Sequence, residues 1–418
     1  MTDATPAWPA LTAFGQQLPP ERVAVRATGN RVKFADGKTR LCATSGLWNV
    51  NLGYSYEPVI NAVATALADG SYLPAFRTSH GRLDAASAAL LDLVGAPYRR
   101  VFWTTGGASS VEASIKLARI TQQVRGERGR RKVASLHRGF HGLTQGTMAL
   151  TGDPFDRRLY ATDQREILHL RLDAPGAHDR ALALGPQLTA IVIEPVSGTG
   201  TVPLSADDLE LVAGLQRQGT IVIADEVATG FGRTGVLLAS HTWPSPPDLV
   251  CLSKALTNGA VPAGVVLLAS SIVAALDDAP ETILMHAETG AGHPTAAAAV
   301  AAVCAAFANP VQMRALRDRA EAFAAHVEQA VANAGADVGI SRSGAGAFQT
   351  LHVDTAATRP QLIADLVERI RDRGVVVHPA PSGVTLVPPL ITEQSDAETI
   401  VGETLDVLAS VAQTQVTA

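Results

Sequence analysis

The sequence predicts an α/β fold in which a mostly parallel sheet is covered by helices on both faces, followed by a smaller α+β unit. Short apolar runs alternate with helical segments through the middle of the chain, which is the pattern of βαβ units. Hydrophobic residues make up 47% and charged residues 17% of the chain, with much alanine and glycine, as suits close packing of helices on a sheet. The length of 418 residues exceeds the usual size of one core, so two domains, or one domain with a satellite, are expected.

The N-terminal part predicts a hairpin and then a helix. Within residues 31–48, Val32-Lys33-Phe34-Ala35 reads as a strand, Asp36-Gly37 suits a tight turn, and Arg40-Leu41-Cys42 reads as the returning strand. A helix is predicted over residues 57–69.

The middle of the chain predicts strands and helices in alternation, so the strands are expected to pair in parallel. The last strand of the series is expected to be antiparallel. The predicted order is strand 101–103, helix 109–123, strand 132–135, strand 190–193, helix 206–217, strand 220–224, strand 249–252 and strand 264–268.

A shift in composition after this series marks the start of the smaller unit. Residues 295–334 are predicted to be helical with a break at Asn309-Pro310, because proline interrupts the hydrogen bonding of a helix. The remaining predicted elements are strand 347–353, helix 359–373, strand 374–377, strand 384–386 and helix 395–412.

Charge and cysteine content argue against several classes of function. The net charge of -5 gives no long-range attraction to nucleic acid or to an anionic membrane, and the basic segment 125–132 is interpreted as a solvated loop. Cys42, Cys251 and Cys304 are too widely spaced for a disulfide framework or a metal site. The first residues lack a secretion signal, and the apolar run 294–307 is too short to span a bilayer, so a cytoplasmic protein is expected.

An acidic pair and a lysine follow two neighbouring predicted strands. Asp225 and Glu226 end an apolar strand, and adjacent strand residues point to opposite faces, so Glu226 is interpreted as structural. Arg233, in the glycine-rich turn that follows, is expected to have an internal ion-pair partner. Lys254 lies in an apolar segment, where lysine is costly unless it is exposed, paired or chemically used. Burial would lower its pKa and make it a nucleophile or base, whereas the alternative is a lysine whose ammonium reaches solvent.

Three other strand ends carry groups that suit a bound ligand. The small residues Gly106-Gly107-Ala108-Ser109 open a helix whose free N–H groups can bind phosphate, although an ordinary strand-to-helix turn explains them equally well. Phe140 can stack on a planar cofactor or simply pack in the core, and His141 can be a hydrogen-bonding partner or a structural histidine. Glu194, before Pro195, can act in the site or cap a loop.

Together these residues resemble the class III pyridoxal-phosphate-dependent aminotransferases, a family of the fold-type I architecture. The resemblance runs from about residue 30 to residue 412, and the order and spacing of its anchors argue against chance. The matching segments are Asp36-Gly37, Ser45-Gly46-Leu47-Trp48, Gly53-Tyr54, 112–119, Phe140-His141-Gly142, Glu194-Pro195, 225–235, Lys254, 286–294 and Pro388-Pro389-Leu390.

The resemblance implies a large domain with a mostly parallel seven-stranded sheet and a smaller α+β domain built from the two chain ends. Residues 1–45 would be an N-terminal segment that joins the small domain, residues 46–293 the large cofactor-binding domain, and residues 294–418 the C-terminal small domain. The resemblance also implies a homodimer in which Thr289 completes the phosphate site of the neighbouring subunit.

The same resemblance assigns roles around pyridoxal 5'-phosphate (PLP). Lys254 would hold the cofactor covalently and, after the amine substrate displaces it, move the substrate proton. Asp225 would pair with the pyridine nitrogen and keep it protonated. The other implied positions are Gly107 and Ala108 at the phosphate, Phe140 and Val227 on the two ring faces, His141 and Glu194 in the surrounding cofactor site, and Trp48 at the substrate entrance.

Departures from the family pattern bear on the substrate. Residues 106–109 lack the usual hydroxyls and the glutamate that follows them. Phe140 stands in place of a tyrosine, Ala228 in place of a glutamine, and Gly290 in place of an aromatic residue. Thr385 stands where members that act on amino acids often carry arginine, so a bidentate partner for a substrate carboxylate is lost.

The sequence therefore predicts an aminotransferase whose acceptor is a ketone or aldehyde without a carboxylate near the reacting carbon. A carbonyl on a modified peptide or another natural-product intermediate would fit an open pocket. The alternatives are an ω-amino acid, diamine or diaminopelargonate-type transaminase and an aminomutase on the same scaffold. A catalytically silent scaffold protein is a further alternative, which the presence of both Asp225 and Lys254 disfavours.

Overall fold

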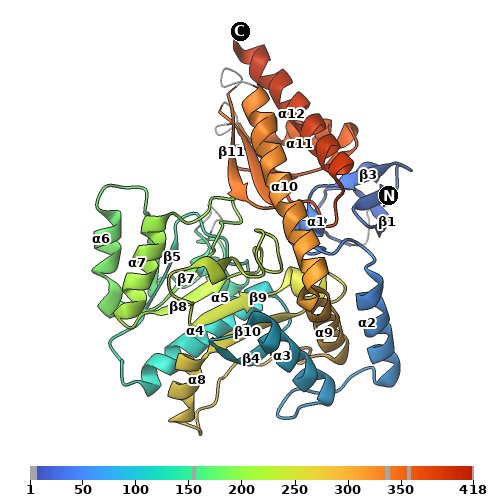
Figure 1. Ribbon diagram of the computed structural model, residues 1–418. Coiled ribbons are helices and arrows are strands. Elements are labelled where there is room, and N and C mark those ends of the chain that lie inside the picture. The colour runs from blue at the N-terminus through green and yellow to red at the C-terminus, as the bar shows by residue number, and fades with distance from the viewer. Residues whose placement is uncertain (1–6, 153–156, 335–338, 355–358, 417–418) are drawn as a thin grey trace.

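The structure of the protein is a computed structural model that describes residues 7–152, 157–334, 339–354 and 359–416. Its strands form three sheets, which the helices surround (Figure 1). The first six residues, where the sequence predicts no secretion signal, lie outside the described residues.

The largest sheet has seven strands in the order β4-β10-β9-β8-β7-β5-β6. Neighbouring strands from β9 to β6 are parallel, whereas β10 is antiparallel to both β9 and β4. The predicted fold class is therefore confirmed, including the antiparallel strand. The strands of this sheet are β4 (Tyr98–Thr104), β5 (Lys132–Leu136), β6 (Ile167–Leu170), β7 (Leu188–Ile193), β8 (Ile221–Asp225), β9 (Leu249–Leu252) and β10 (Gly264–Ala269).

The four central strands, β7 to β10, are buried along their whole length. Their runs of valine, isoleucine and leucine suit a sheet that is covered on both faces. Helix α4 (Gly107–Val124) packs on β9 and β10. Helix α7 (Ala206–Arg217) begins at a reciprocal cap between Ser205 and Asp208, which fixes where it starts.

Helices α2 (Glu57–Asp69) and α3 (Gly81–Val94) both pack against α9 (Pro294–Ala308). Helix α9 is mostly buried there, although the sequence counts it in the C-terminal domain. The domain bounds at residues 45/46 and 293/294 stay a prediction. The other short helices of this part are α1 (Ser45–Trp48), α5 (Gln145–Leu150), α6 (Ala177–Leu182), α8 (Ser270–Asp277), η1 (Pro20–Arg22), η2 (Gly185–Gln187), η3 (Ala239–Thr242) and η4 (Lys254–Thr257).

The two chain ends build the smaller unit together, as predicted. Strand β13 (Val375–Val376) pairs in parallel with β3 (Thr39–Cys42) and so extends the sheet β1-β2-β3-β13. A third sheet has the order β11-β12-β15-β14, and α10 reaches it from α9 (Figure 1). The remaining elements are β1 (Ala24–Thr28), β2 (Arg31–Phe34), α10 (Pro310–Ala334), β11 (Ile340–Ala345), β12 (Phe348–Val353), α11 (Pro360–Asp372), β14 (His378–Ala380), β15 (Gly383–Leu386) and α12 (Gln394–Val416).

The predicted hairpin is present as β2 and β3, and the predicted helices 57–69 and 206–217 have the observed bounds. The sequence-based prediction omitted α3, β6 and β11, and also β1, α5, α6, α8 and β14. Helix α3 carries buried Leu83, Ala86, Leu90 and Val94 at helical spacing, so its pattern was readable. Strand β11 has one buried residue and β6 is a short edge strand, so neither has the apolar run of a central strand.

No single helix in the described ranges is long and apolar enough to cross a membrane. Helices α9 and α10 pass the test of length and composition only as a pair, and they are bent by 81° at the break between them. That break lies at Asn309, where the sequence predicts it.

Arg233 has no ion pair with any described residue, so the predicted internal ion pair is wrong. Its fully buried guanidinium donates hydrogen bonds to the carbonyl oxygens of Pro388 (2.6 Å) and Ala347 (3.2 Å). It also donates to Ser45 Oγ at 3.0 Å and to Asn51 Oδ1. Arg233 therefore ties residues after β8 to both the N-terminal and the C-terminal parts of the chain.

Replacing Arg233 with methionine is expected to lower the free energy of unfolding by about 3 kcal/mol or more, because four buried acceptors lose a charged donor. Urea unfolding of Arg233→Met would measure the loss. The matched control is Arg217→Met, which removes an exposed ion pair with Glu210 and should change stability little. Equal urea midpoints for the two variants would contradict the role assigned to Arg233.

Candidate functional site

The site lies at the carboxyl edge of the central sheet, where β7, β8 and β9 end side by side. In register, Ile193 pairs with Ala224 and Asp225 pairs with Cys251. Glu194 directly follows β7, Asp225 is the last residue of β8, and Lys254 follows β9 after one residue. Parallel strands thus deliver two carboxylates and an amine to one edge, which is the usual place for ligands in open α/β sheets.

A cavity of about 530 Å³ opens at this edge. All residues that the sequence assigns to the site line it except Thr289. The cavity-lining residues are Leu11, Leu47, Trp48, Gly107, Ala108, Phe140, His141, Gly142, Glu194, Gly198, Thr199, Gly200, Asp225, Val227, Ala228, Ser253, Lys254, His378, Pro379, Ala380, Pro381 and Thr385.

Asp225 and His141 form a buried pair in this cavity. The Nδ1 atom of His141 lies 2.8 Å from Oδ2 of Asp225, and the backbone N–H of Val227 donates to Oδ1 of Asp225 at 3.2 Å. Burial lowers the pKa of His141, but the hydrogen bond and charge of Asp225 outweigh burial and hold that pKa above its ordinary value. The pair therefore keeps a negative carboxylate in a fixed orientation beside the cavity.

Glu194 holds the backbone on which Phe140 sits. Its Oε2 accepts a hydrogen bond from the backbone N–H of Phe140 at 2.9 Å, and its Oε1 accepts one from Gly198 at 2.8 Å. Burial raises the pKa of Glu194 above its ordinary value. Glu226 points elsewhere, as predicted, and accepts hydrogen bonds from the backbone N–H groups of Ala239 and Ser240.

Lys254 begins the 3₁₀ turn η4 in a left-handed conformation with φ of 47°. This backbone region is unfavourable for a residue with a side chain and occurs most often at functional sites. Burial lowers the pKa of Lys254, although the charges of Asp225 and Glu194 act in the opposite direction. The Nζ atom lies 4.9 Å from the ring centre of Trp48.

Trp48 ends the α1 segment, whose residues all have positive φ. Its ring meets the rings of Phe348 at 6.1 Å and His378 at 4.8 Å between centres, both edge-on. Thr385 lies across the sheet from His378 in register, and its hydroxyl hydrogen-bonds that of Thr350 at 2.9 Å. This wall of the cavity therefore comes from both ends of the chain.

His378 is a site residue that the sequence-based prediction missed. Strand 384–386 was predicted, but its hairpin partner β14 was not. The turn residues Pro381-Ser382 between the two strands, followed by Gly383, would have revealed the hairpin and placed His378 opposite Thr385.

The helix start at Gly107 is closely packed. A Cβ atom on Gly107 would lie 2.8 Å from Cγ1 of Val227, so only glycine fits without a shift. Ser109, which replaces the family glutamate, donates a hydrogen bond to Glu288, and so does the Thr105 hydroxyl. The carboxylate of Glu288, which is distant in the sequence, therefore lies at this turn. The sequence-based prediction did not include this contact.

Thr289 lies outside the cavity and is exposed. Its carbonyl oxygen accepts a hydrogen bond from the Tyr72 hydroxyl at 3.1 Å. The hydrogen bonds of Glu288 fix the segment that carries Thr289 against the start of α4. Within one subunit, Thr289 therefore does not join the other predicted site residues.

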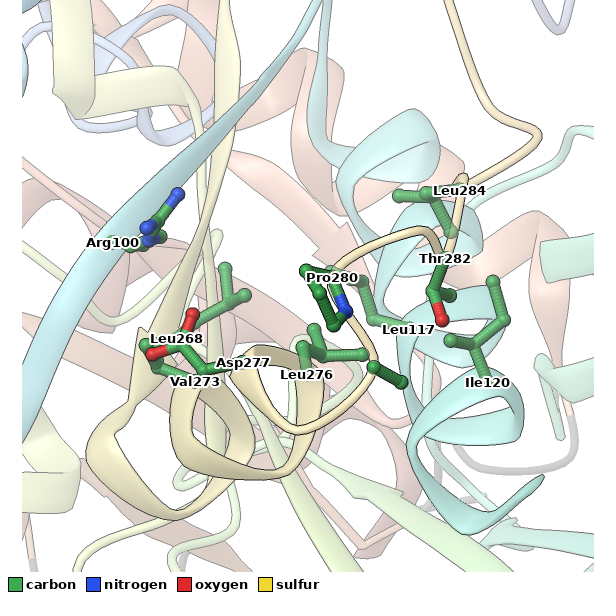
Figure 2. Close-up of a pocket in the computed structure, with 11 residues that line it drawn as sticks. Arg100, Leu117, Ile120, Leu268, Val273, Leu276, Asp277, Pro280, Thr282 and Leu284 are labelled. Carbon is green, nitrogen blue, oxygen red and sulfur yellow. The ribbon is translucent and has the colours of Figure 1, made fainter. Parts of the chain in front are cut away.

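A second cavity, of about 300 Å³, lies between α4, α8, the edge strand β4 and its neighbour β10 (Figure 2). Leu117 and Ile120 of α4 face Leu276 of α8 across it, and Arg100 and Asp277 are its charged residues. It contains no residue predicted for the site. The chemistry-bearing side chains are therefore concentrated in the cavity at the carboxyl edge.

Comparisons with known proteins agree on one family. A family model described as aminotransferase class-III matches residues 14–408. An omega-aminotransferase of Caulobacter vibrioides is 27% identical over 432 residues, which cover 96% of this chain and 98% of that protein. An acetylornithine aminotransferase of Mycobacterium tuberculosis is 31% identical over 398 residues, which cover 94% and 92%. The crystal structure of an amine transaminase from an uncultivated Pseudomonas species, in its PLP-bound form, is 27% identical, with a TM-score of 0.84 and coverage of 97% and 98%.

The Asp225–His141 pair predicts a specific titration. Replacing Asp225 with asparagine removes the charge that raises the pKa of His141, so burial should then lower this pKa below its ordinary value of 6.5. NMR titration of ¹³C-histidine-labelled protein would measure the fall. His352, half-buried and remote in sequence, serves as the internal control. A His141 pKa that is the same in the variant and the parent would contradict the pairing.

Proposed function

The chain belongs to the class-III aminotransferases, and we propose that it transfers an amino group to a ketone or aldehyde without a carboxylate near the reacting carbon. The enzyme uses PLP, as its family does. The observation that carries the proposal is the lining of the cavity: among the described residues that line it, Lys254 is the only lysine or arginine.

The residues of the cavity fit PLP in their chemistry. A buried carboxylate, an amine, an aromatic ring and a helix N-terminus lie around one space, and PLP presents a cationic ring nitrogen, an aldehyde, a flat ring and a phosphate. Gly107 fits only as glycine against Val227, which keeps the helix start close to that space. When bound, PLP supplies an electron sink for the negative charge that develops on the carbon bearing the amino group.

We assign the proton transfer to Lys254. The lowered pKa of its buried ammonium increases the fraction of neutral amine near neutral pH. A neutral amine at this position would hold PLP through its aldehyde group and would take and return the proton of the substrate. The left-handed backbone at Lys254 directs this side chain from the loop after β9 into the cavity.

We assign the orientation of the ring to Asp225, Phe140 and Val227. Asp225 would face the ring nitrogen, held in place by His141 and by the N–H of Val227. Phe140 would cover one face of the ring and Val227 the other, and Glu194 fixes the backbone of Phe140. The N–H groups at Gly107 and Ala108, where α4 begins, would bind the phosphate.

We propose a homodimer in which Thr289 completes the phosphate site of the neighbouring subunit. Thr289 is exposed and outside its own cavity, so within one subunit it has no place in the site. Large apolar side chains near it are exposed as well, which favours a protein partner at this surface. They include Tyr72, Leu73, Phe76, Ile283 and Met285.

We also propose a cytoplasmic location. Cys42, Cys251 and Cys304 are all buried and free of disulfide bonds. Unpaired cysteines are usual in a reducing compartment.

The substrate proposal rests on the described lining of the cavity, which contains no second lysine or arginine beside Lys254. A carboxylate next to the reacting carbon normally needs arginine, whose planar fork binds it through two hydrogen bonds. Thr385 instead bonds to Thr350, and Ala228 offers no polar group. Burial and then the charge of Lys254 lower the pKa of His378 to about 4, so its ring is neutral at neutral pH.

A carbonyl on a modified peptide would also fit this lining.

A second candidate is transfer from an ω-amino group, as the name of the Caulobacter relative indicates for that protein. Such a donor also keeps its carboxylate away from the reacting carbon, so the same lining suits it. An aminomutase would form product from one substrate with no separate donor.

Lys254→Ala is expected to lower kcat by about 10³-fold or more, because both the covalent anchor and the base are lost. Borohydride treatment of the PLP-loaded parent protein, followed by peptide mapping, should place the pyridoxyl label on Lys254. Lys33→Ala, which changes an exposed lysine on β2, is the control. A label that maps to another lysine would overturn the assignment.

Acceptor specificity tests the substrate proposal. The wild-type kcat/KM is expected to be higher with hexan-2-one than with 2-oxoglutarate when the amino donor is the same. Thr385→Arg should raise kcat/KM for 2-oxoglutarate by about 10-fold or more, because a charge-assisted hydrogen bond is added, whereas Thr385→Met should not. A wild-type enzyme that prefers 2-oxoglutarate would contradict the proposal.

A further inference from the structure

His378 is the polar group of the cavity wall that faces Lys254 from the small unit. It lies on β14 directly across from Thr385, so both side chains are on the same face of that sheet. Its ring packs edge-on against Trp48 at 4.8 Å, and Lys254 Nζ lies over the ring of the same tryptophan. His378 is therefore held beside the reacting position by rigid neighbours on two elements.

No described residue forms a hydrogen bond with the ring nitrogens of His378, and the half-buried ring lies in the wall of the cavity, so its nitrogens remain accessible from there. A neutral imidazole offers one donor and one acceptor. Because no protein group occupies these nitrogens, the imidazole is free to form a hydrogen bond with a molecule bound in the cavity.

The rim of the cavity next to His378 is apolar. Leu47 and Leu11 are exposed there, and Pro379 and Ala380 of β14 and Pro381 after it continue the lining. No arginine, lysine, aspartate or glutamate of the described chain belongs to this part of the lining. A bound molecule thus meets apolar surface beside the neutral imidazole of His378, while the neighbouring Thr385 hydroxyl is already bonded to Thr350.

We propose that His378 is a specificity-determining residue that forms one hydrogen bond with an uncharged amide group on the acceptor, while the apolar rim contacts the rest of that molecule. The inference rests on the proposed function, because it concerns an acceptor without a carboxylate near the reacting carbon. It adds the chemical class of that acceptor: a carbonyl compound that carries an amide, as a peptide does.

Two ketones of equal chain length test the proposal. N-acetylaminoacetone carries an amide where hexan-2-one carries methylene groups. The ratio of their kcat/KM values should favour the amide in the wild-type enzyme, and His378→Phe should lower that ratio about 3- to 10-fold, as one lost hydrogen bond implies. His378→Gln keeps a donor and an acceptor and should retain most of the ratio. PLP absorbance shows whether each variant is loaded, and His378→Leu takes the place of His378→Phe if the latter does not bind PLP.

The outcomes separate the two proposals. A ratio that is the same in the wild type, His378→Phe and His378→Leu overturns the role of His378 while the preference for neutral ketones stands. A fall of both kcat/KM values by the same factor also overturns it, because that is the effect of a merely structural residue. If the wild-type kcat/KM is higher for 2-oxoglutarate than for both ketones, the proposed function is contradicted, and so is the inference that rests on it.

Discussion

The parallel register of β7, β8 and β9 is the constraint on which the site depends. Because side chains alternate between the two faces along a strand, a slip of one residue would move every side chain to the other face of the sheet, and these strands are buried throughout. The register therefore fixes Glu194, Asp225 and the loop to Lys254 at one edge. Each carboxylate is then anchored locally, Asp225 by His141 and Glu194 by the backbone of Phe140 and Gly198. The chemistry thus follows from the packing of the sheet before any ligand is considered.

The two ends of the chain complete the wall of the cavity at this edge. The N-terminal segment supplies Trp48, and the hairpin of β14 and β15 supplies His378 and Thr385. Strand β13 pairs with β3, so both ends of the chain belong to one sheet. Arg233 connects this unit to the turn after β8 through Ser45, Asn51 and two carbonyl groups. The buried guanidinium of Arg233 has no described carboxylate partner, so its charge is stabilised only if its four hydrogen-bond acceptors stay in place. The position of the cavity wall and the position of the turn after β8 therefore depend on each other.

The sequence predicted those parts of the fold and site that depend on local patterns. Apolar strands, the capped helix 206–217 and the acid at the end of β8 are visible in short windows. Other parts of the site depend on contacts between segments that are far apart in the sequence, as for Arg233 with Asn51 and Ser109 with Glu288. The pairing of His378 with Thr385 depends on a hairpin that was not recognised. Local periodicity carries no information about such contacts. Thr289 differs from both groups. The family resemblance suggests its role at the phosphate, but a second subunit would have to supply the site in which it acts.

The central claim is that the carboxylate which β8 delivers faces the ring nitrogen of the cofactor. The most direct test is the ¹⁵N chemical shift of that nitrogen in protein loaded with isotope-labelled PLP. The account predicts a protonated nitrogen at neutral pH in the wild type and an unprotonated one in Asp225→Asn, because only the charged carboxylate stabilises the proton. An unprotonated nitrogen in the wild type, or the same shift in both proteins, would contradict it.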